Sequence, residues 1–188
     1  MNQEMNEKKR QNKIFLISLS GLFTAMIFIL TAYVHVPTGQ GYTHAGDGLI
    51  YLAACILPTP YAVAASALGG ALADGLSGFI IWLPGTLVIK AVTALFFTSK
   101  RDKIICLRNI LGIIPSWVLC VCAYSLYQGT IMTLSDGDSI TFAAIGAAFL
   151  QTPTYTIQVV ASSVLFIILG LALDKMNFKK KFLKLAYK

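Results

Sequence analysis

One stretch of the chain, residues 41–98, constrains the fold more than any other, because it combines the hydrophobicity of membrane segments with three ionisable side chains. Asp47, Asp74 and Lys90 interrupt apolar runs that are also rich in Gly, Ala and Pro. Placing Asp or Lys at the centre of a membrane helix costs roughly 2.5–3.5 kcal/mol. We therefore expect these side chains to pair with one another or to contact a polar ligand.

The whole chain has the composition of an integral membrane protein. Of its 188 residues, 56% are hydrophobic and only 12% are charged, against about 25% charged residues in soluble domains. The apolar runs are long and do not alternate, which favours helices over a transmembrane barrel. Basic residues flank these runs in the positive-inside pattern, so the net charge of +7 does not indicate a nucleic-acid partner. Fourteen of the fifteen basic residues form three clusters, and the fifteenth is Lys90: the clusters are Lys8, Lys9, Arg10 and Lys13; Lys100, Arg101, Lys103 and Arg108; and Lys175, Lys179, Lys180, Lys181, Lys184 and Lys188.

These patterns predict an all-α fold, an integral membrane bundle of six transmembrane helices with both termini cytoplasmic. Residues 1–12 are expected to form a cytoplasmic segment, 13–173 the membrane domain, and 174–188 a basic cytoplasmic tail that forms an interfacial helix. The second, third and fourth helices are short for a bilayer of about 30 Å, which favours a ligand pocket among them. Residues 35–45 are expected as an outer loop, and the helices at 13–34, 47–57, 61–76, 85–98, 104–128 with a kink at Pro115, and 140–173 with a break near Pro153.

The three charges admit two readings. Asp74 and Lys90 lie in the outer parts of consecutive helices and could form an ion pair that only fixes those helices, or one of them could also touch a ligand. Asp47 stands at a helix start, where a carboxylate is ordinarily stabilised by free backbone N–H groups. The choice between support and ligand contact stays open at this point.

The sequence contains no pattern typical of an enzyme. There is no nucleophile–base constellation and no phosphate-binding loop, and the two histidines have no acidic or cysteine partner at metal-ligand spacing. We therefore expect no catalytic residues, no metal and no cofactor. The four cysteines are interpreted as small packing residues. A small membrane assembly protein without a ligand is the main alternative to a ligand-binding protein.

A longer motif indicates a family. Residues 41–54, read as GYTHAGDGLIYLAA, are similar to a segment of the substrate-binding S components of energy-coupling-factor (ECF) vitamin transporters. The similarity continues through LGGALAD at 68–74 and through Gly78, Trp82, Pro84 and the TLVIK run that ends at Lys90. Within these S components, the sequence most resembles the group named for riboflavin. That group also includes proteins for hydroxymethylpyrimidine and pyridoxine-type ligands.

This resemblance implies a mechanism. An S component of a bacterial plasma membrane binds a small heteroaromatic vitamin or precursor at its outer face, and a membrane T subunit with two ATP-binding-cassette ATPases then drives its delivery inward. Small residues on the first helix dock the T subunit in that family, and the corresponding pair here is Gly21 and Ala25. From the residues alone, the same pair could equally pack within the bundle.

The resemblance also implies roles for individual side chains. The first outer loop would cover the ligand, the three intramembrane charges would anchor it or support the anchors, and Trp82 would stack on its ring. The fifth and sixth helices would complete the wall. The candidate substrate-binding residues are Gln40, Tyr42, His44, Asp47, Asp74, Trp82, Lys90, Tyr124, Gln128, Gln151 and Tyr155.

Overall fold

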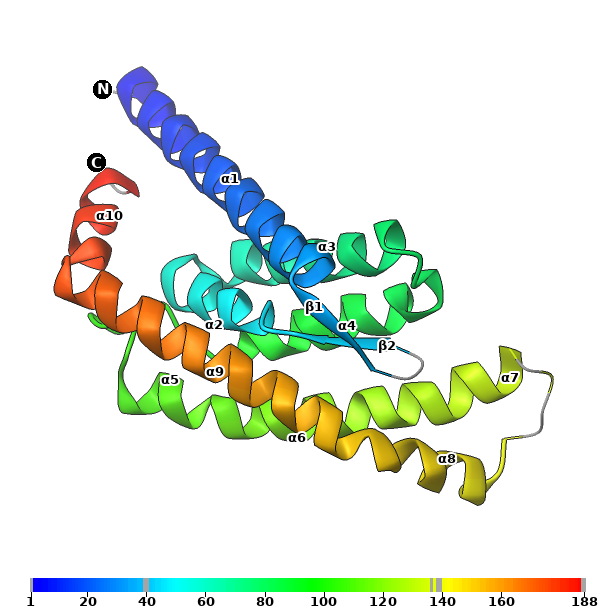
Figure 1. The fold of residues 1–188 in the computed structure, drawn as a ribbon. Helices are drawn as coiled ribbons and strands as arrows, with labels where there is room; N and C mark the ends of the chain where they lie inside the picture. The colour runs from blue at the N-terminus through cyan, green and yellow to red at the C-terminus, as the bar shows by residue number, and fades with distance from the viewer. Residues whose placement is uncertain (1, 39–40, 136, 138–139, 187–188) are drawn as a thin grey trace.

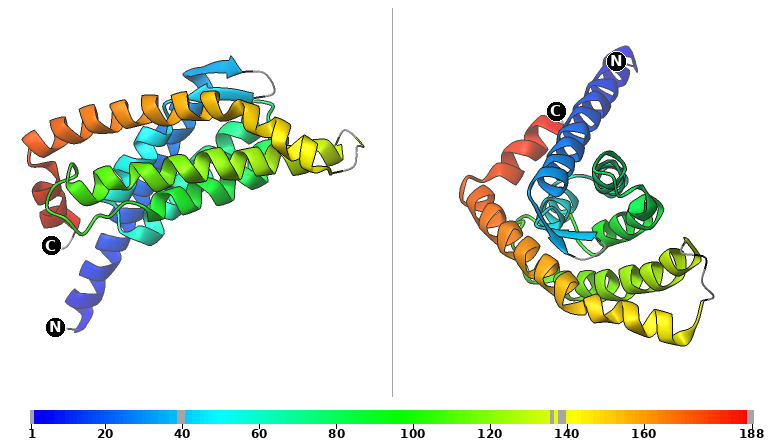
Figure 2. Two further views of the ribbon diagram at one scale, coloured as in Figure 1. Left: turned by 90° about the horizontal axis from the view of Figure 1, so that it is seen from below. Right: turned by 45° about the vertical axis from the view of Figure 1, so that its right-hand side comes forward.

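The computed structural model is an α-helical bundle in which a long first helix leads into a set of shorter ones (Figure 1). It describes residues 2–38, 41–135, 137 and 140–186. Helix α1 spans Asn2–Tyr33 and therefore includes the polar residues that were expected to precede the membrane domain. The first turns are rich in Glu, Gln, Lys and Met, which have high helix propensity, so the helix continues outward beyond the apolar run. Figure 2 shows this part of α1 projecting from the bundle.

The next three helices are short, as predicted. Helix α2 spans Asp47–Ile56, α3 spans Thr59–Leu76, and α4 spans Leu83–Leu95 after a 3-10 turn at Ile80–Trp82. Pro60 and Pro84 occupy the first turns of α3 and α4, where the missing N–H of proline costs no hydrogen bond. Helices α3 and α4 lie side by side in the upper layer of Figure 1.

Glycines in α3 allow its neighbours to approach closely. A Cβ atom added at Gly69 would lie 2.8 Å from the Ile27 Cβ of α1, and one added at Gly70 would lie 2.9 Å from the Lys90 Cγ of α4. Both distances are shorter than side-chain packing permits, so α3 requires glycine at both positions. The packing of α1 and α4 on α3 thus depends on these two adjacent residues.

The last two predicted helices are each divided. Helix α5 spans Leu107–Leu111 and α6 spans Ile113–Tyr127, followed by a π-helical turn at Gln128–Met132 and by α7 at Thr133–Ser135. A kink was expected at Pro115, and the helix is instead divided at Gly112; Pro115 lies in the first turn of α6 and cannot donate to the Leu111 carbonyl, where α5 ends. The expected break near Pro153 is present, as α8 (Phe142–Ala148) gives way to a 3-10 turn at Phe149–Gln151 before α9 (Thr152–Lys175).

The segment expected as an outer loop forms a β-hairpin instead. Strand β1 (His35–Thr38) pairs antiparallel with β2 (Gly41–His44), with His35 opposite His44. Each strand has only four residues and contains no alternating apolar pattern, so neither strand can be predicted from its local sequence. The Tyr42 ring lies 4.8 Å from the Phe79 ring, which places the hairpin near the C-terminal end of α3.

The basic clusters gather at the opposite end of the molecule. Helix α10 (Phe178–Ala186) packs on α1, with the Phe182 and Phe15 ring centroids 5.7 Å apart. The buried Lys179 donates to the Arg101 carbonyl, and burial lowers the pKa of this lysine. The Asp174 carboxylate accepts from the backbone N–H groups that end the 96–106 connection. The start of α1, this connection and α10 therefore form one basic end.

Three helical stretches in the described chain are long and apolar enough to cross a membrane, namely Met5–Tyr33, Leu107–Ile131 and Phe142–Lys175. Many large apolar side chains are exposed along them, including Ile17 and Leu150, as a lipid-facing surface requires. The all-α membrane bundle is thereby confirmed. The count of six spans and the cytoplasmic position of the termini stay predictions.

Candidate ligand pocket

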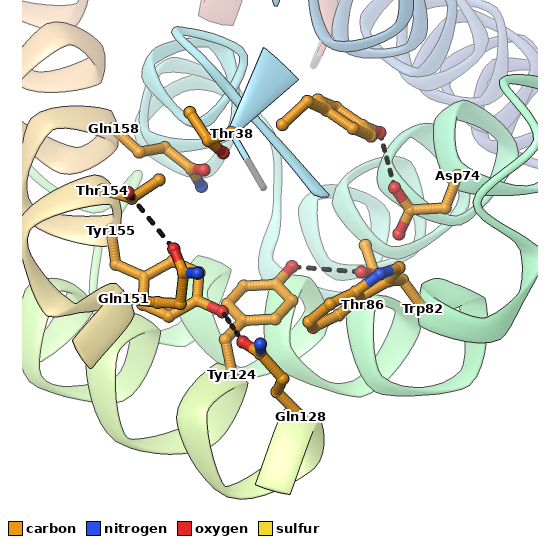
Figure 3. Close-up of a pocket in the computed structure, with 11 residues that line it drawn as sticks. Thr38, Asp74, Trp82, Thr86, Tyr124, Gln128, Gln151, Thr154, Tyr155 and Gln158 are labelled. Atoms are coloured by element: carbon orange, nitrogen blue, oxygen red, sulfur yellow. Dashed lines mark hydrogen bonds between the residues drawn. The ribbon is translucent and has the colours of Figure 1, made fainter. Parts of the chain in front are cut away.

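A pocket lies between the α3–α4 pair and the α6–α9 pair, on the side covered by the hairpin (Figure 3). The space between these side chains that no protein atom fills amounts to about 510 Å³, and this volume includes open solvent at the mouth of the pocket. The lining residues are Thr38, Tyr42, Asp74, Trp82, Thr86, Tyr124, Gln128, Gln151, Thr154, Tyr155 and Gln158.

Aromatic rings form much of the pocket wall. The rings of Tyr124 and Tyr155 are stacked, with centroids 5.6 Å apart, and the Trp82 ring lies 6.0 Å from that of Tyr124. The hydroxyl of Tyr124 is 3.1 Å from the hydroxyl of Thr86, which fixes the ring against α4. These flat faces can stack on a planar ring system.

One acidic side chain lines the pocket and has an oxygen without a partner. The Tyr42 hydroxyl donates to Asp74 Oδ1 at 2.5 Å, which links the hairpin to α3. The other carboxylate oxygen of Asp74 and the indole Nε1 of Trp82 have no hydrogen-bond partner within the described part of the chain, although both side chains are more than nine-tenths buried. Such groups are costly unless something satisfies them. A bound ligand can do so.

The glutamines of the pocket are oriented by their neighbours. Gln158 donates its Nε2 to Asp47 Oδ2 at 2.9 Å, and because a carboxylate only accepts, the amide oxygen is the atom left for the pocket. Gln128 Oε1 accepts from the Tyr155 hydroxyl at 3.1 Å. The two hydrogen bonds therefore set the orientation of both side-chain amides without a ligand.

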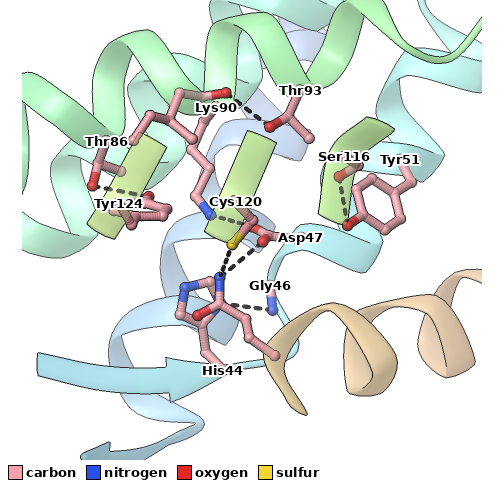
Figure 4. A network of polar contacts seen from close by, with 12 residues as sticks. His44, Gly46, Asp47, Tyr51, Thr86, Lys90, Thr93, Ser116, Cys120 and Tyr124 are labelled. Atoms are coloured by element: carbon pink, nitrogen blue, oxygen red, sulfur yellow. Dashed lines mark hydrogen bonds and ion pairs between the residues drawn. The ribbon is translucent and has the colours of Figure 1, made fainter. Parts of the chain in front are cut away.

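A buried ion pair lies beneath the pocket and corrects one expectation. Lys90 Nζ is 2.6 Å from Asp47 Oδ1, and the two side chains are 2% and 3% exposed (Figure 4). The predicted partner of Lys90 was Asp74, which instead accepts from Tyr42. The ammonium group also lies 5.2 Å from the centre of the Tyr124 ring. The pair thus supports the pocket wall from behind, through Tyr124 and Gln158.

The hairpin residue His44 also serves as support. Its Nδ1 accepts a 3.0 Å hydrogen bond from the Gly46 N–H, just before α2 begins. Burial lowers the pKa of His44 to about 4, so the imidazole is neutral at pH 7 and can accept this bond. Burial, followed by the charge of Asp74, raises the pKa of Tyr42, so its hydroxyl keeps the proton that it donates.

The structure brings most of the sequence-predicted residues to the pocket. Three candidates, His44, Asp47 and Lys90, do not line it, and Gln40 lies outside the described residues. The four lining residues that were not predicted are polar and belong to the hairpin, α4 and α9. The predicted lining residues are Tyr42, Asp74, Trp82, Tyr124, Gln128, Gln151 and Tyr155, and the additional ones are Thr38, Thr86, Thr154 and Gln158.

Helical spacing carried a signal for three of these additional residues. Gln151, Thr154 and Gln158 recur at intervals of three and four, so they share one face of a helix with the predicted Tyr155. Thr86 of α4 stands four residues after Trp82, the last residue of the preceding 3-10 turn, and a helical spacing of four brings both side chains to the same side. Thr38 could not be found in this way, because its position depends on the hairpin.

The proposed docking pair lies far from the pocket, on α1. Both Gly21 and Ala25 are exposed, and a Cβ atom added at Gly21 would meet no atom within 4 Å. The pair therefore does not pack within the bundle, which was one of the two readings. Within the described residues, no group of three His, Cys, Asp or Glu side chains could hold a metal ion.

Comparison with known proteins identifies the family. The model of the family described as "ECF-type riboflavin transporter, S component" matches residues 11–175. Searches of curated proteins and of solved structures gave no match. The match covers every helix that lines the pocket, and a protein of this kind is a substrate-binding subunit of a transporter, not an enzyme. The chain therefore belongs to the ECF-type riboflavin transporter S component family.

Proposed function

We propose that this protein is the substrate-capture subunit of an ATP-driven vitamin importer in a bacterial plasma membrane. It binds a small heteroaromatic vitamin or precursor, of the hydroxymethylpyrimidine, pyridoxine or riboflavin type, at its outer face. It then delivers the ligand inward together with a T subunit and two ATP-binding-cassette ATPases. Both termini and the basic tail at 174–188 lie in the cytoplasm, and residues 13–173 form the membrane domain.

The observation that carries this proposal is the character of the pocket. Stacked aromatic rings stand beside a buried carboxylate oxygen and an indole N–H that have no hydrogen-bond partner among the described residues. An apolar pocket with a few convergent polar groups is typical of a small-molecule site. Its position under the hairpin, at the end opposite the basic clusters, supports an outer location because basic residues favour the cytoplasmic side.

A binding experiment can use the two tryptophans of the chain as a matched pair. Trp82 lines the pocket, whereas Trp117 is 41% exposed and donates to Thr156. The first measurement is mass spectrometry of small molecules released from the purified protein on denaturation. A heteroaromatic compound near one equivalent per chain is expected. Absence of any released compound, together with no binding of added vitamins, would refute ligand capture.

The second measurement compares two substitutions by titration with the released compound. Trp82→Phe removes the indole N–H and shrinks the stacking face, so the Kd should rise at least about 10-fold. Trp117→Phe should leave the Kd unchanged, and its only remaining tryptophan reports ligand stacking through quenched fluorescence. Equal effects of the two substitutions would argue against this pocket.

The docking role of α1 is tested separately. Gly21 and Gly146 are both exposed glycines whose added Cβ would meet no atom within 4 Å. Gly21→Leu should leave ligand binding intact and abolish co-purification with the T subunit and ATPases, because close helix approach needs a small residue. Gly146→Leu, on α8, is the control and should preserve the complex. Loss of the complex in both variants, or in neither, would contradict docking through Gly21.

A further inference from the structure

We infer that the pocket selects ring compounds that present a hydrogen-bond donor and carry no acidic group, and that Asp74 is the residue that enforces this selection. The inference rests on the proposed function and makes it more specific. It predicts that the phosphorylated or carboxylated form of a ligand is rejected, even when the ring is the same.

The charges around the pocket provide the first argument. Among the described lining residues, Asp74 carries a carboxyl group, and no Lys, Arg or His side chain lines the pocket. The buried cation Lys90, which lies behind the pocket wall, is held 2.6 Å from Asp47 and is 2% exposed. An anionic ligand would therefore meet a carboxylate and no free counter-charge. Repulsion between like charges in a partly desolvated site disfavours binding strongly.

The hydrogen-bonding atoms provide the second argument. Asp74 Oδ2 lies within no hydrogen-bond geometry of another described residue, whereas Oδ1 accepts from the Tyr42 hydroxyl. Trp82 Nε1 likewise donates to no described atom. Figure 3 shows both side chains on the same side of the pocket, across from Gln158. A ring edge that offers a donor to the carboxylate and an acceptor to the indole N–H satisfies both groups.

The opposite wall is consistent with the same ligand. Asp47 holds the Nε2 of Gln158, so this amide presents its oxygen, a second acceptor, to the space. The protein thus offers two acceptors to a ligand that must supply donors. Amino, ring N–H or hydroxyl groups meet this requirement, whereas a phosphate or carboxylate supplies acceptors and negative charge.

The test uses three matched pairs of probes on the full-length protein in detergent. The pairs are hydroxymethyl-aminopyrimidine, pyridoxine and riboflavin, each with its phosphate monoester. The Kd is measured by isothermal titration for all six compounds. For whichever ring binds, the phosphate ester should bind about 100-fold more weakly or worse. A fourth comparison replaces the amino group of the pyrimidine by methyl, which keeps the shape and removes the donor, and should weaken any pyrimidine binding at least about 10-fold.

A substitution assigns the selection to Asp74. Asp74→Asn keeps the shape and removes the charge, so the affinity ratio within a pair should narrow to less than about 10-fold. A merely structural role would weaken both members equally and leave the ratio unchanged. Asp102→Asn, at an exposed site at the basic end, is the control and should preserve the wild-type ratio. If Asp74→Asn does not fold, the wild-type ratios alone still decide the charge selection.

The outcomes separate this inference from the proposed function. Equal affinity for an unphosphorylated compound and its phosphate ester would overturn the inference and leave ligand capture standing. Release of a phosphorylated or carboxylated compound from the purified protein would do the same. If no unphosphorylated probe binds and no compound is released, both the inference and the proposed function are wrong.

Discussion

The Asp47–Lys90 ion pair gives the most quantitative prediction. At an effective dielectric constant of about 20, two unit charges 2.6 Å apart attract each other by about 6 kcal/mol. Desolvation offsets much of this attraction, but removal of one partner leaves the other charge buried alone. Lys90→Met, which keeps the apolar volume, should therefore lower the free energy of unfolding by about 3–5 kcal/mol.

A double-mutant cycle isolates the contribution of the pair. Asp47→Asn alone leaves Lys90 unpaired and should cost a similar amount, whereas the double variant buries no charge and keeps an amide oxygen that can accept from Gln158. The double variant should therefore lose less unfolding free energy than the two single variants lose together, by about 2 kcal/mol or more. Lys103→Met, at an exposed site, is the control and should fall within about 0.5 kcal/mol of wild type.

The assay is equilibrium unfolding in mixed micelles, followed by tryptophan fluorescence, with ligand affinity measured on the same samples. Single variants within 1 kcal/mol of wild type, or strictly additive losses, would refute the electrostatic argument. Ligand affinity of the double variant should stay within about 10-fold of wild type, because neither charge lines the pocket. Complete loss of binding by a folded double variant would instead indicate that Asp47 or Lys90 contacts the ligand directly.

Two further predictions concern packing and pH. Gly69→Ala places a Cβ atom 2.8 Å from the Ile27 Cβ and should lower the free energy of unfolding by about 1–3 kcal/mol. In Gly21→Ala the added Cβ meets no described atom within 4 Å, so the substitution should be neutral or slightly stabilising. Thermal unfolding compares the two variants, and equal stabilities would contradict close packing at Gly69. For His44, the pKa of about 4 in the folded protein lies below the ordinary histidine value of 6.5. The unfolded chain therefore binds more protons between these two values, and stability falls as the pH drops from 6.5 through 4. Comparing Tm at pH 7 and 4.5 should show a smaller fall in His44→Gln than in wild type, and an identical fall would refute the role of this imidazole.

The sequence predicted the fold through its hydrophobic runs and breakers. Helix bounds in the short central helices were within about two or three residues, since Pro60 and Pro84 mark helix starts directly. The hairpin was missed because pairing of two four-residue strands depends on the surface beneath them. The Tyr42–Phe79 ring contact and the Tyr42–Asp74 hydrogen bond supply that surface, and neither is visible as a local pattern.

The sequence indicated which residues belong to the candidate site more reliably than it indicated which of them contact one another. Lys90 stood out as the one basic residue that topology did not explain, and its burial confirms that it needed a partner. The choice of Asp74 as partner assumed that consecutive helices pair their charges. The actual partner comes from α2, which packs on α4 as well as on α9, and such a non-consecutive arrangement has no signature in one sequence.

The Asp47–Lys90 pair has a consequence for the response of the protein to voltage. A single charge that moves through a potential of 100 mV exchanges about 2.3 kcal/mol with the electric field. The two opposite charges are 2.6 Å apart and move together with their helices, so the field does almost no net work on them. A movement of α2 and α4 across the bilayer can therefore carry this buried lysine, and the ion pair adds almost no dependence on the membrane potential to that movement.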